Sequence, residues 1–377
     1  MRLQSLPPVG NAIRLERSFE PLEQLLPGYR LVWVHSGTAA LAYSLAQLKR
    51  RFPQVARPEV IIPGYCCPDL LSAAVYAGFT AKIVDICAAD PSYDLTQLQG
   101  ALTAKTLAVI AVNFLGIAER LTEIRQLIRP WPKIALIEDN AQWFPDQQEV
   151  AQLEGDYVTF SFGRGKAVNL LGGGLVAIKD PIALFDLGLA HEAQSTLWLL
   201  KARLISLLTQ PWVYYWLEKL TVLKLGITVY HPLTQISLMS PAKVQLVKAN
   251  VSHYRAMNRT AQKQLLERIP ANQNRLHQLL LSSRCRRLLR FPLLFDDVAT
   301  RSALLEEVEG KGMGVSCFYN TELLAVEGVE ALGIALAALP NARSFAHRLV
   351  TFPTHPRVKP KHLAAITALF KTVQLSE

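Results

Sequence analysis

The sequence has no long uninterrupted apolar segment and few cysteines. It contains no run of eighteen or more uncharged apolar residues, which argues against a membrane-spanning helix. Residues 1–27 include three glutamates and no continuous apolar run, which argues against a signal peptide. The five cysteines are odd in number, and their spacing fits neither a zinc site nor a disulfide framework. We therefore expect a cytoplasmic protein with reduced thiols and no bound metal.

The sequence also lacks internal repeats and low-complexity segments. Its 377 residues include 20 glycines and 22 prolines, which are ordinary contents, and half of all residues are hydrophobic. A chain of this length and composition can bury a large core and is expected to form about two domains.

Positive charge exceeds negative charge, with a net charge of +10. One interpretation is a solvated basic surface. The other is a functional patch that attracts an anionic substrate, such as a nucleotide, or an anionic membrane surface. We expect no nucleic-acid partner.

Short apolar strands alternate with helical patterns through the first half of the chain. Strands are predicted at 31–34, 59–63, 82–85, 107–112, 134–137, 155–161 and 172–178, with the last as the hairpin partner of the one before it. Helices are predicted at 39–51, 69–77, 95–102 and 119–128. The pattern indicates an α/β fold with a mostly parallel sheet covered on both faces. Ligands of such sheets bind beyond the carboxyl ends of the strands.

The second half changes in character. Residues 195–230 form two apolar helical stretches interrupted by Pro211, and residues 239–269 show a long helical pattern. A smaller α+β domain follows, with strands predicted at 287–292, 314–318 and 349–352 and helices at 301–311, 342–348 and 360–372. We therefore predict a large domain over 1–238, containing the 195–230 insertion, and a connector helix with a small domain over 239–377.

The insertion has two interpretations. Apolar residues at helical spacing usually pack on a core or in a dimer interface. The alternative is an amphipathic element on a membrane surface, with its tryptophans and tyrosines at the level of the lipid headgroups.

Small and polar clusters follow three of the predicted strands. They are Ser36-Gly37-Thr38, the segment 138–142 and the segment 161–166, which ends in Lys166. An enzyme that uses pyridoxal phosphate (PLP) needs an amine for the cofactor aldehyde, a carboxylate for the ring nitrogen, a phosphate cup and a flat group over the ring.

Individual residues can meet these needs. Lys166 can supply the amine and Asp139 the carboxylate, while Gly37, Thr38 and Ser161 can bind the phosphate and Gln142 can reach the ring hydroxyl. Each residue also has an ordinary interpretation. Lys166 could be a surface lysine, Asp139 could cap a helix, and Ser36 or Thr38 could cap the helix that follows. Their common position at the strand ends favours the functional interpretation.

The sequence resembles the DegT/DnrJ/StrS family of PLP-dependent sugar aminotransferases. The resemblance rests on Ser36 to Leu41, on the Glu138-Asp139-x-Ala141-Gln142 box, on Phe160-Ser161-Phe162-x-x-x-Lys166 with its trailing glycines, and on Phe352-Pro353-x-His355-Pro356. It implies an aspartate-aminotransferase-like fold of type I. It implies that Lys166 forms the Schiff base, that Asp139 holds the pyridine nitrogen and that Gln142 lies on the side of the ring hydroxyl. Ser36, Gly37, Thr38 and Ser161 would bind the phosphate.

The family resemblance also implies partners. The substrate would be a nucleotide-linked keto-sugar, the amino donor glutamate or glutamine, and the assembly a homodimer with active sites at the subunit interface. Two positions depart from the family pattern. Cys67 stands where the family commonly has a ring-stacking aromatic residue, and Tyr65, two residues earlier, can stack instead. The segment Gln235 to Met239 lacks the Asn and Arg with which a family loop reaches the neighbouring subunit's phosphate.

We therefore predict an aminotransferase for a keto-sugar in polysaccharide or glycoconjugate biosynthesis. A PLP-dependent sugar dehydratase is an alternative, although that branch has histidine in place of the lysine. A second alternative is a scaffold or regulatory protein at a membrane surface that keeps the fold but has lost turnover. A nucleotide-binding Rossmann enzyme fits poorly, because Gly172 to Gly174 lack a G-x-G-x-x-G spacing and a following helix.

Overall fold

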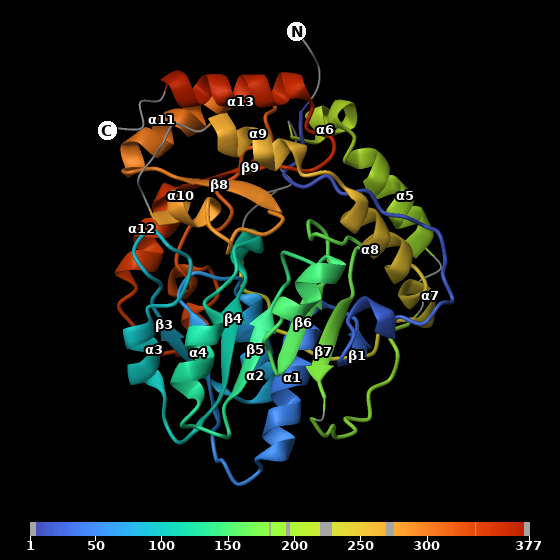
Figure 1. Cartoon of the computed structure of the whole chain (residues 1–377), viewed down its shortest axis with the longest axis vertical. Helices are drawn as coiled ribbons and strands as arrows, with labels where there is room; N and C mark the ends of the chain where they lie inside the picture. The colour runs from blue at the N-terminus through green and yellow to red at the C-terminus, as the bar shows by residue number, and fades with distance from the viewer. Residues whose placement is uncertain are drawn as a thin grey trace.

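The protein consists of a large sheet with helices on both faces and a smaller lobe built around a two-stranded sheet (Figure 1). The computed structural model describes residues 5–180, 182–193, 197–218, 228–268, 275–335 and 337–372. The α/β architecture expected from the alternating apolar strands is confirmed.

The large sheet has seven strands in the order β1-β7-β6-β5-β4-β2-β3. The neighbouring pairs from β3 to β6 are parallel, whereas β7 runs antiparallel to both β6 and β1. The hairpin expected between the last two strands is thus present. The strands are β1 (Tyr29–Val34), β2 (Glu59–Pro63), β3 (Thr80–Val84), β4 (Thr106–Val112), β5 (Ala135–Asp139), β6 (Tyr157–Ser161) and β7 (Gly174–Lys179).

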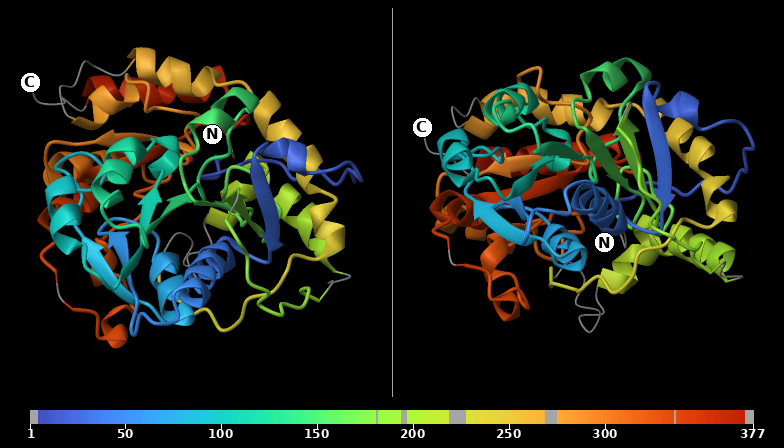
Figure 2. Two further views of the ribbon diagram at one scale, coloured as in Figure 1. Left: turned by 60° about the horizontal axis from the view of Figure 1, so that its bottom comes forward. Right: turned by 90° about the horizontal axis from the view of Figure 1, so that it is seen from below.

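Four helices cover the two faces of this sheet (Figure 2). In β4, Ala108 and Ile110 belong to the same core cluster as α1 and α2, while Val109 and Ala111 belong to the cluster formed with α3 and α4. Successive residues point to opposite faces, so the central strands are buried on both sides and read as continuous apolar runs. The helices are α1 (Gly37–Arg51), α2 (Asp69–Ala77), α3 (Leu95–Ala101) and α4 (Leu121–Ile128).

The smaller lobe holds the antiparallel pair β8 and β9 among the C-terminal helices (Figure 1). Its elements are β8 (Arg290–Leu294), β9 (Leu349–Pro353), α9 (Thr260–Arg268), α10 (Arg275–Leu280), α11 (Val298–Val308), α12 (Pro340–Arg348) and α13 (Pro360–Thr372). Among the described residues, the short 3-10 helices are Glu23–Leu25, Phe114–Gly116, Gln147–Gln152, Leu323–Ala325 and Glu330–Leu332.

Two predictions for the second half are wrong in detail. The helical pattern over 239–269 forms three helices, α7 (Pro241–Val244), α8 (Val247–Ala256) and α9, with residue 269 outside the described residues. The chain becomes extended at Met257, and the Asn258 side chain then accepts the Thr260 N–H at 3.1 Å. The strand expected at 314–318 makes only a single bridge, from Ser316 to Thr351, because Gly314 and Phe318 adopt left-handed backbone with positive φ.

The apolar insertion forms α5 (Trp198–Leu208) and α6 (Pro211–Glu218), separated at Pro211 as expected. Residues 195, 196 and 219–227 of the predicted segment lie outside the described residues. Among the helices that the structure describes, none is long and apolar enough to cross a membrane.

An N-terminal strap, residues 5–11, connects the lobe to the large sheet. The Leu6 N–H donates to the Gly312 carbonyl at 2.8 Å, and the His355 ring lies 2.9 Å from the Pro7 carbonyl oxygen. Farther along, the Asn11 side chain donates to the Ala167 carbonyl at 2.8 Å, one residue after Lys166. The strap therefore contacts the lobe at one end and the turn after β6 at the other.

Candidate active site

Lys166 lies in a glycine-rich turn that follows the carboxyl end of β6. Its N–H donates to the Gly163 carbonyl at 3.3 Å, and Gly165 takes a positive φ of 78° that lets the chain turn back toward β7. The side chain is half-buried. Its positive charge is close enough to lower the pKa of Asp139, which ends the neighbouring strand β5. The amine and the carboxylate are thus brought to one edge of the sheet.

Asp139 is a buried carboxylate, with only 5% of its surface exposed. Burial raises its pKa to about 6, while the Ala141 N–H, the Lys166 ammonium and the Thr159 hydroxyl act to lower it. The Ala141 N–H donates to Asp139 Oδ1 at 2.9 Å, and the Thr159 hydroxyl lies 3.5 Å from the same oxygen. A buried carboxylate with so little compensation suits a cationic ring nitrogen as its partner.

The start of α1 and the end of β6 form a close backbone junction. A Cβ atom on Gly37 would lie 2.6 Å from Ser161 Cβ, so only glycine allows the helix to approach the Ser161 hydroxyl this closely. The first N–H groups of a helix have no partner within it and attract phosphate. Gly37, at the start of α1, therefore lies close to the Ser161 hydroxyl, as a phosphate site at this helix start would require.

Ser36 has a different task from its two neighbours. Its hydroxyl accepts the Ala39 N–H at 3.0 Å and caps α1, which is the ordinary interpretation considered for this residue. Ser36 thus fixes the start of α1, which lies next to Ser161.

Gln142 connects the sheet edge to the smaller lobe. Its carbonyl oxygen accepts the Leu115 N–H at 2.6 Å, and its amide nitrogen donates to the Tyr319 hydroxyl at 3.3 Å. The side chain is buried and held at both ends, which fixes its orientation beside Asp139. Sequence reasoning missed Tyr319, because its only signal was a position at the end of an expected strand in the second domain.

The two candidates for covering the cofactor ring occupy different environments. Tyr65 is buried among the rings of Phe114, Tyr319 and Phe345, with centroids 5.1–5.5 Å away, and its hydroxyl donates to the Tyr319 carbonyl at 3.0 Å. With 1% of its surface exposed, it has no free face, so the structure does not support ring stacking by Tyr65.

Cys67 is the candidate that lies beside the lysine. Burial raises the pKa of its thiol to about 12, with Asp69 acting in the same direction and Lys166 against it. A small, protonated thiol therefore stands where the family commonly has an aromatic ring.

The segment Gln235 to Met239 packs on its own chain. Leu238 bridges to Val34, and the Met239 N–H donates to the Trp33 carbonyl at 3.0 Å. A Cβ atom on Gly173 would lie 2.4 Å from the buried Met239 side chain. This segment thus supports the edge strand β1 immediately before the Ser36 cap.

Comparison with known proteins gives the same family as the sequence motifs. Residues 16–187 match the model of the DegT/DnrJ/EryC1/StrS aminotransferase family. Protein MosB of Rhizobium meliloti is 32% identical over 179 residues, which make up 46% of this chain and 34% of MosB. The match thus spans about a third of that relative's length.

Two solved structures show how far the fold is shared. A putative sugar aminotransferase, Spr1654 from Streptococcus pneumoniae in its PLP form, has a TM-score of 0.66 and 18% identity, covering 96% of this chain and 93% of that one. The E. coli GDP-4-keto-6-deoxy-D-mannose-3-dehydratase with bound hydrated PLP has a TM-score of 0.66 and 16% identity, covering 94% and 90%.

These likenesses show a type I fold over nearly the whole chain, and the family match includes every strand of the large sheet together with Lys166. Residues 16–187 are thus similar to the DegT/DnrJ/EryC1/StrS family of aminotransferases, and the whole chain shares its fold with PLP-dependent sugar aminotransferases.

Proposed function

We propose that this protein transfers an amino group from an amino acid, glutamate or glutamine, to a keto-sugar linked to a nucleotide. The supporting observation is the position of Lys166 beside the buried Asp139, on the same sheet edge as the Gly37 and Ser161 junction. We further propose a role in polysaccharide or glycoconjugate biosynthesis and a homodimeric assembly, as the resemblance to this family implies.

The residues present fit the cofactor at three points. Asp139 would hold the ring nitrogen, because a cation there compensates a carboxylate that burial now penalises. Gly37, Thr38 and Ser161 would hold the phosphate at the start of α1. Cys67, whose thiol is close enough to Lys166 to feel its charge, would cover less of the ring than an aromatic residue would. When bound, PLP supplies an aldehyde that exchanges amino groups and a ring that takes up electrons.

The protein's own groups would perform the remaining tasks. The Lys166 amine is the basic group beside Asp139 and would carry a proton between the donor carbon and the cofactor carbon in each half of the reaction. Asp139 would keep the ring nitrogen protonated. Gln142, held by Leu115 and Tyr319, would orient the ring at its hydroxyl side.

The lysine also bears on the dehydratase alternative. The family branch that dehydrates sugars has histidine in place of the lysine, so Lys166 favours amino transfer. Lysine has a primary amine that can form the Schiff base and also move protons. Imidazole can move protons but cannot form the Schiff base.

The test is a half-reaction screen on the purified protein with added PLP. The wild-type protein should show visible absorbance and should lose it when L-glutamate or L-glutamine is added. A panel of keto-sugar nucleotides should then restore it. A Lys166→Ala variant should lack the linkage that borohydride reduction traps in the wild type. A wild-type protein that stays colourless with excess PLP would contradict the proposal.

A second proposal concerns α5 and α6, which we propose rest on an anionic lipid surface. Leu200, Trp212 and Trp216 are 62%, 56% and 58% exposed. Residues 197–216 contain two cations, Lys201 and Arg203, and no acidic residue, and α6 ends at one acidic residue, Glu218. Exposed leucines and tryptophans beside cations are typical of helices that lie in a membrane interface.

Liposome co-sedimentation tests this second proposal. Vesicles with 30 mol% phosphatidylserine should retain the wild-type protein and release a Trp212→Ala/Trp216→Ala variant. A Phe19→Ala variant, which removes an exposed ring elsewhere, should bind like the wild type. If none of the three proteins binds vesicles, and light scattering gives a lower mass for the tryptophan variant than for the wild type, the exposed side of α5 and α6 is a contact between subunits.

A further inference from the structure

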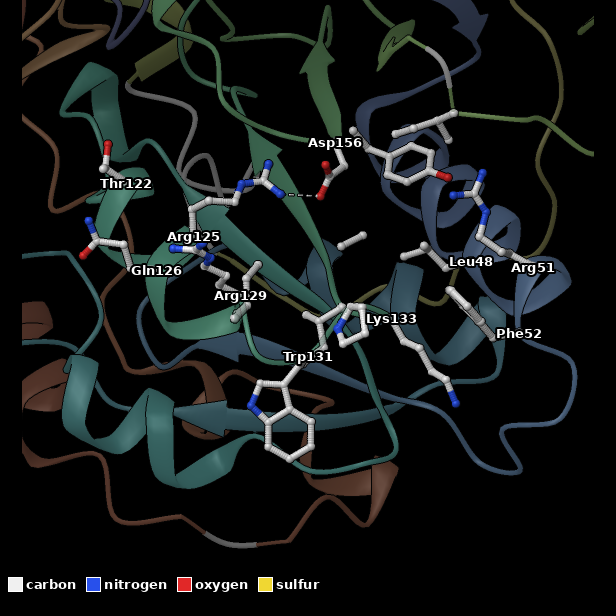
Figure 3. A pocket seen from close by; sticks show the side chains of 16 residues that line it. Leu48, Arg51, Phe52, Thr122, Arg125, Gln126, Arg129, Trp131, Lys133 and Asp156 are labelled. Carbon is white, nitrogen blue, oxygen red and sulfur yellow. Dashed lines mark hydrogen bonds and ion pairs between the residues drawn. The ribbon is translucent and has the colours of Figure 1, made fainter.

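A large cavity lies at the edge of the sheet opposite to Lys166. It has a volume of about 520 Å³ and is formed by the end of α1, by α4 and by the starts of β5 and β6 (Figure 3). Ala135 and Tyr157, the first residues of those two strands, line it, whereas Asp139 and Ser161 stand at their far ends. A five-residue strand separates its ends by about 13 Å. The cavity is therefore distinct from the candidate active site.

The lining carries an excess of positive charge. Its cations are Arg51, Arg125, Arg129 and Lys133, and its one carboxylate is Asp156. Asp156 is already paired with Arg125 at 2.9 Å, as Figure 3 shows, and the nearby carboxylate of Glu154 accepts the Thr122 hydroxyl at 2.8 Å. An anion entering the cavity therefore meets more cationic than anionic side chains.

Two of the cations are available to such an anion. Arg51 donates to the Ala183 carbonyl at 2.8 Å and is partly engaged. Arg129 and Lys133 make no hydrogen bond or ion pair with the residues that the structure describes, and both are exposed. Because these two cations have no ion pair to give up within the described part of the chain, they can contact a phosphate that enters the cavity without breaking an existing interaction.

The rest of the lining is suited to a ring. Trp131 and Phe52 are half-buried and line the cavity, together with the apolar side chains of Leu48 and Ile182 (Figure 3). Nucleic-acid bases stack favourably on aromatic side chains. A cavity of this size also suits a ligand much larger than a free phosphate ion.

Tyr157 adds an independent observation. It is 1% exposed, lines the cavity, and its hydroxyl has no hydrogen-bond partner among the described residues. Burial raises its pKa to about 12, and the nearby Arg51 guanidinium acts against this rise. A buried hydroxyl without a hydrogen-bond partner is costly. A ligand oxygen that accepts a hydrogen bond from the Tyr157 hydroxyl would therefore stabilise the complex.

We propose that this cavity is a second binding site, for a nucleoside phosphate. The base packs against Trp131 and Phe52, and the phosphate binds Arg129 and Lys133. The site does not depend on the proposed amino transfer, because none of its residues belongs to the edge that carries Lys166.

Isothermal titration of UDP into the full-length protein saturated with PLP tests the site. We expect Arg129→Ala/Lys133→Ala to weaken binding at least tenfold and Trp131→Ala to weaken it several-fold. Lys263→Ala/Lys311→Ala, an equal charge change on the smaller lobe, should leave the affinity unchanged. Inorganic pyrophosphate, which lacks a ring, should bind at least tenfold more weakly than UDP. Circular dichroism melting curves confirm that each variant is folded.

The active site itself could bind UDP, so a second pair of measurements separates the two edges. Thr38→Ala/Ser161→Ala, at the cofactor edge, should retain the UDP binding that Arg129→Ala/Lys133→Ala loses. The reverse result would place UDP in the active site and overturn the proposal. Equal loss in the lobe control would also overturn it, because binding would then follow total charge. If the half-reaction screen fails, the expected UDP binding and its loss in Arg129→Ala/Lys133→Ala stay the same.

Discussion

The two edges of the large sheet use polar side chains in opposite ways. At the carboxyl edge, Asp139 and Gln142 are buried, and their hydrogen bonds are supplied by neighbouring strands and by the lobe. At the amino edge, Arg129 and Lys133 are exposed and have no partner among the described residues. The first arrangement fixes geometry and shifts pKa values, as chemistry requires. The second leaves positively charged side chains free to bind an anion reversibly.

The largest difference between the two edges is expected in turnover, when a lysine at each edge is replaced by alanine. Lys166→Ala should reduce amino-transfer turnover by more than about a thousandfold, because it removes both the amine and the proton carrier. Lys179→Ala, at the other end of the neighbouring strand β7, should leave turnover within about twofold. Steady-state kinetics with the substrates found in the half-reaction screen measures both. Similar losses in the two variants would mean that the carboxyl edge is not the catalytic one.

Glycine substitutions extend the comparison to backbone packing. Gly37→Ala should destabilise the protein by about 2–3 kcal/mol and weaken PLP binding, because its Cβ would lie 2.6 Å from Ser161 Cβ. Gly100→Ala, in α3, meets no atom within 4 Å and should be neutral or slightly stabilising. Urea unfolding and PLP titration report the two effects. If Gly37→Ala binds PLP normally, the helix start does not form the phosphate cradle.

The same chemical change should have opposite effects at the two edges. The pKa of Asp139 is raised to about 6 in the folded protein, so its contribution to stability is lost as pH rises from about 4 through 6. Without PLP, Asp139→Asn should therefore be more stable than the wild type at pH 8 by about 2 kcal/mol, and the gain should vanish near pH 4.

Asp156→Asn provides the counterpart at the amino edge. It removes the pairing with Arg125 and should destabilise the protein by about 0.5–1 kcal/mol at pH 8. Thermal melts of the PLP-free proteins at pH 4 and 8 measure both changes. A loss of stability for Asp139→Asn at pH 8 would show that the carboxylate is already compensated without the cofactor.

The smallest effect is expected where the lobe contacts the carboxyl edge. Tyr319→Phe removes the hydroxyl that Gln142 donates to at 3.3 Å and should cost about 0.5–1 kcal/mol, with a modest rise in the PLP dissociation constant. Tyr65→Phe removes a hydrogen bond within the aromatic cluster and should lower stability without changing PLP affinity. If the two variants weaken PLP binding equally, the contact of Tyr319 with Gln142 does not affect the cofactor site.

The sequence predicted the carboxyl edge better than any other part of the molecule. Continuous apolar runs ending in Asp139 and Ser161 specify parallel strands, and parallel strands bring their ends together, so the site residues could be grouped without coordinates. Tyr65 could not be placed in this way, because an aromatic residue after a strand can point into the core as readily as into a site. The structure shows three rings packed around it.

Other features escaped prediction for physical reasons. The helical pattern over 239–269 does not reveal that Met257 turns extended, because the break depends on a local cap by Asn258 rather than on Pro or Gly. The cavity at the amino edge is formed by residues from α1, α4 and two strand starts, and no sequence spacing relates them. Apolar periodicity in 195–230 predicted helices but left open whether their leucines and tryptophans would be buried or exposed, and several of them are exposed.

The N-terminal strap gives the molecule a mechanical connection between its two parts. Pro7 and Pro8 accept hydrogen bonds from His355 and Arg290 in the lobe, while Asn11 holds the backbone next to Lys166. If the lobe shifts relative to the sheet, residues 5–11 must either follow it or release Ala167. A pull on this short segment would therefore act directly on the turn that contains Lys166, without passing through the sheet or its helices.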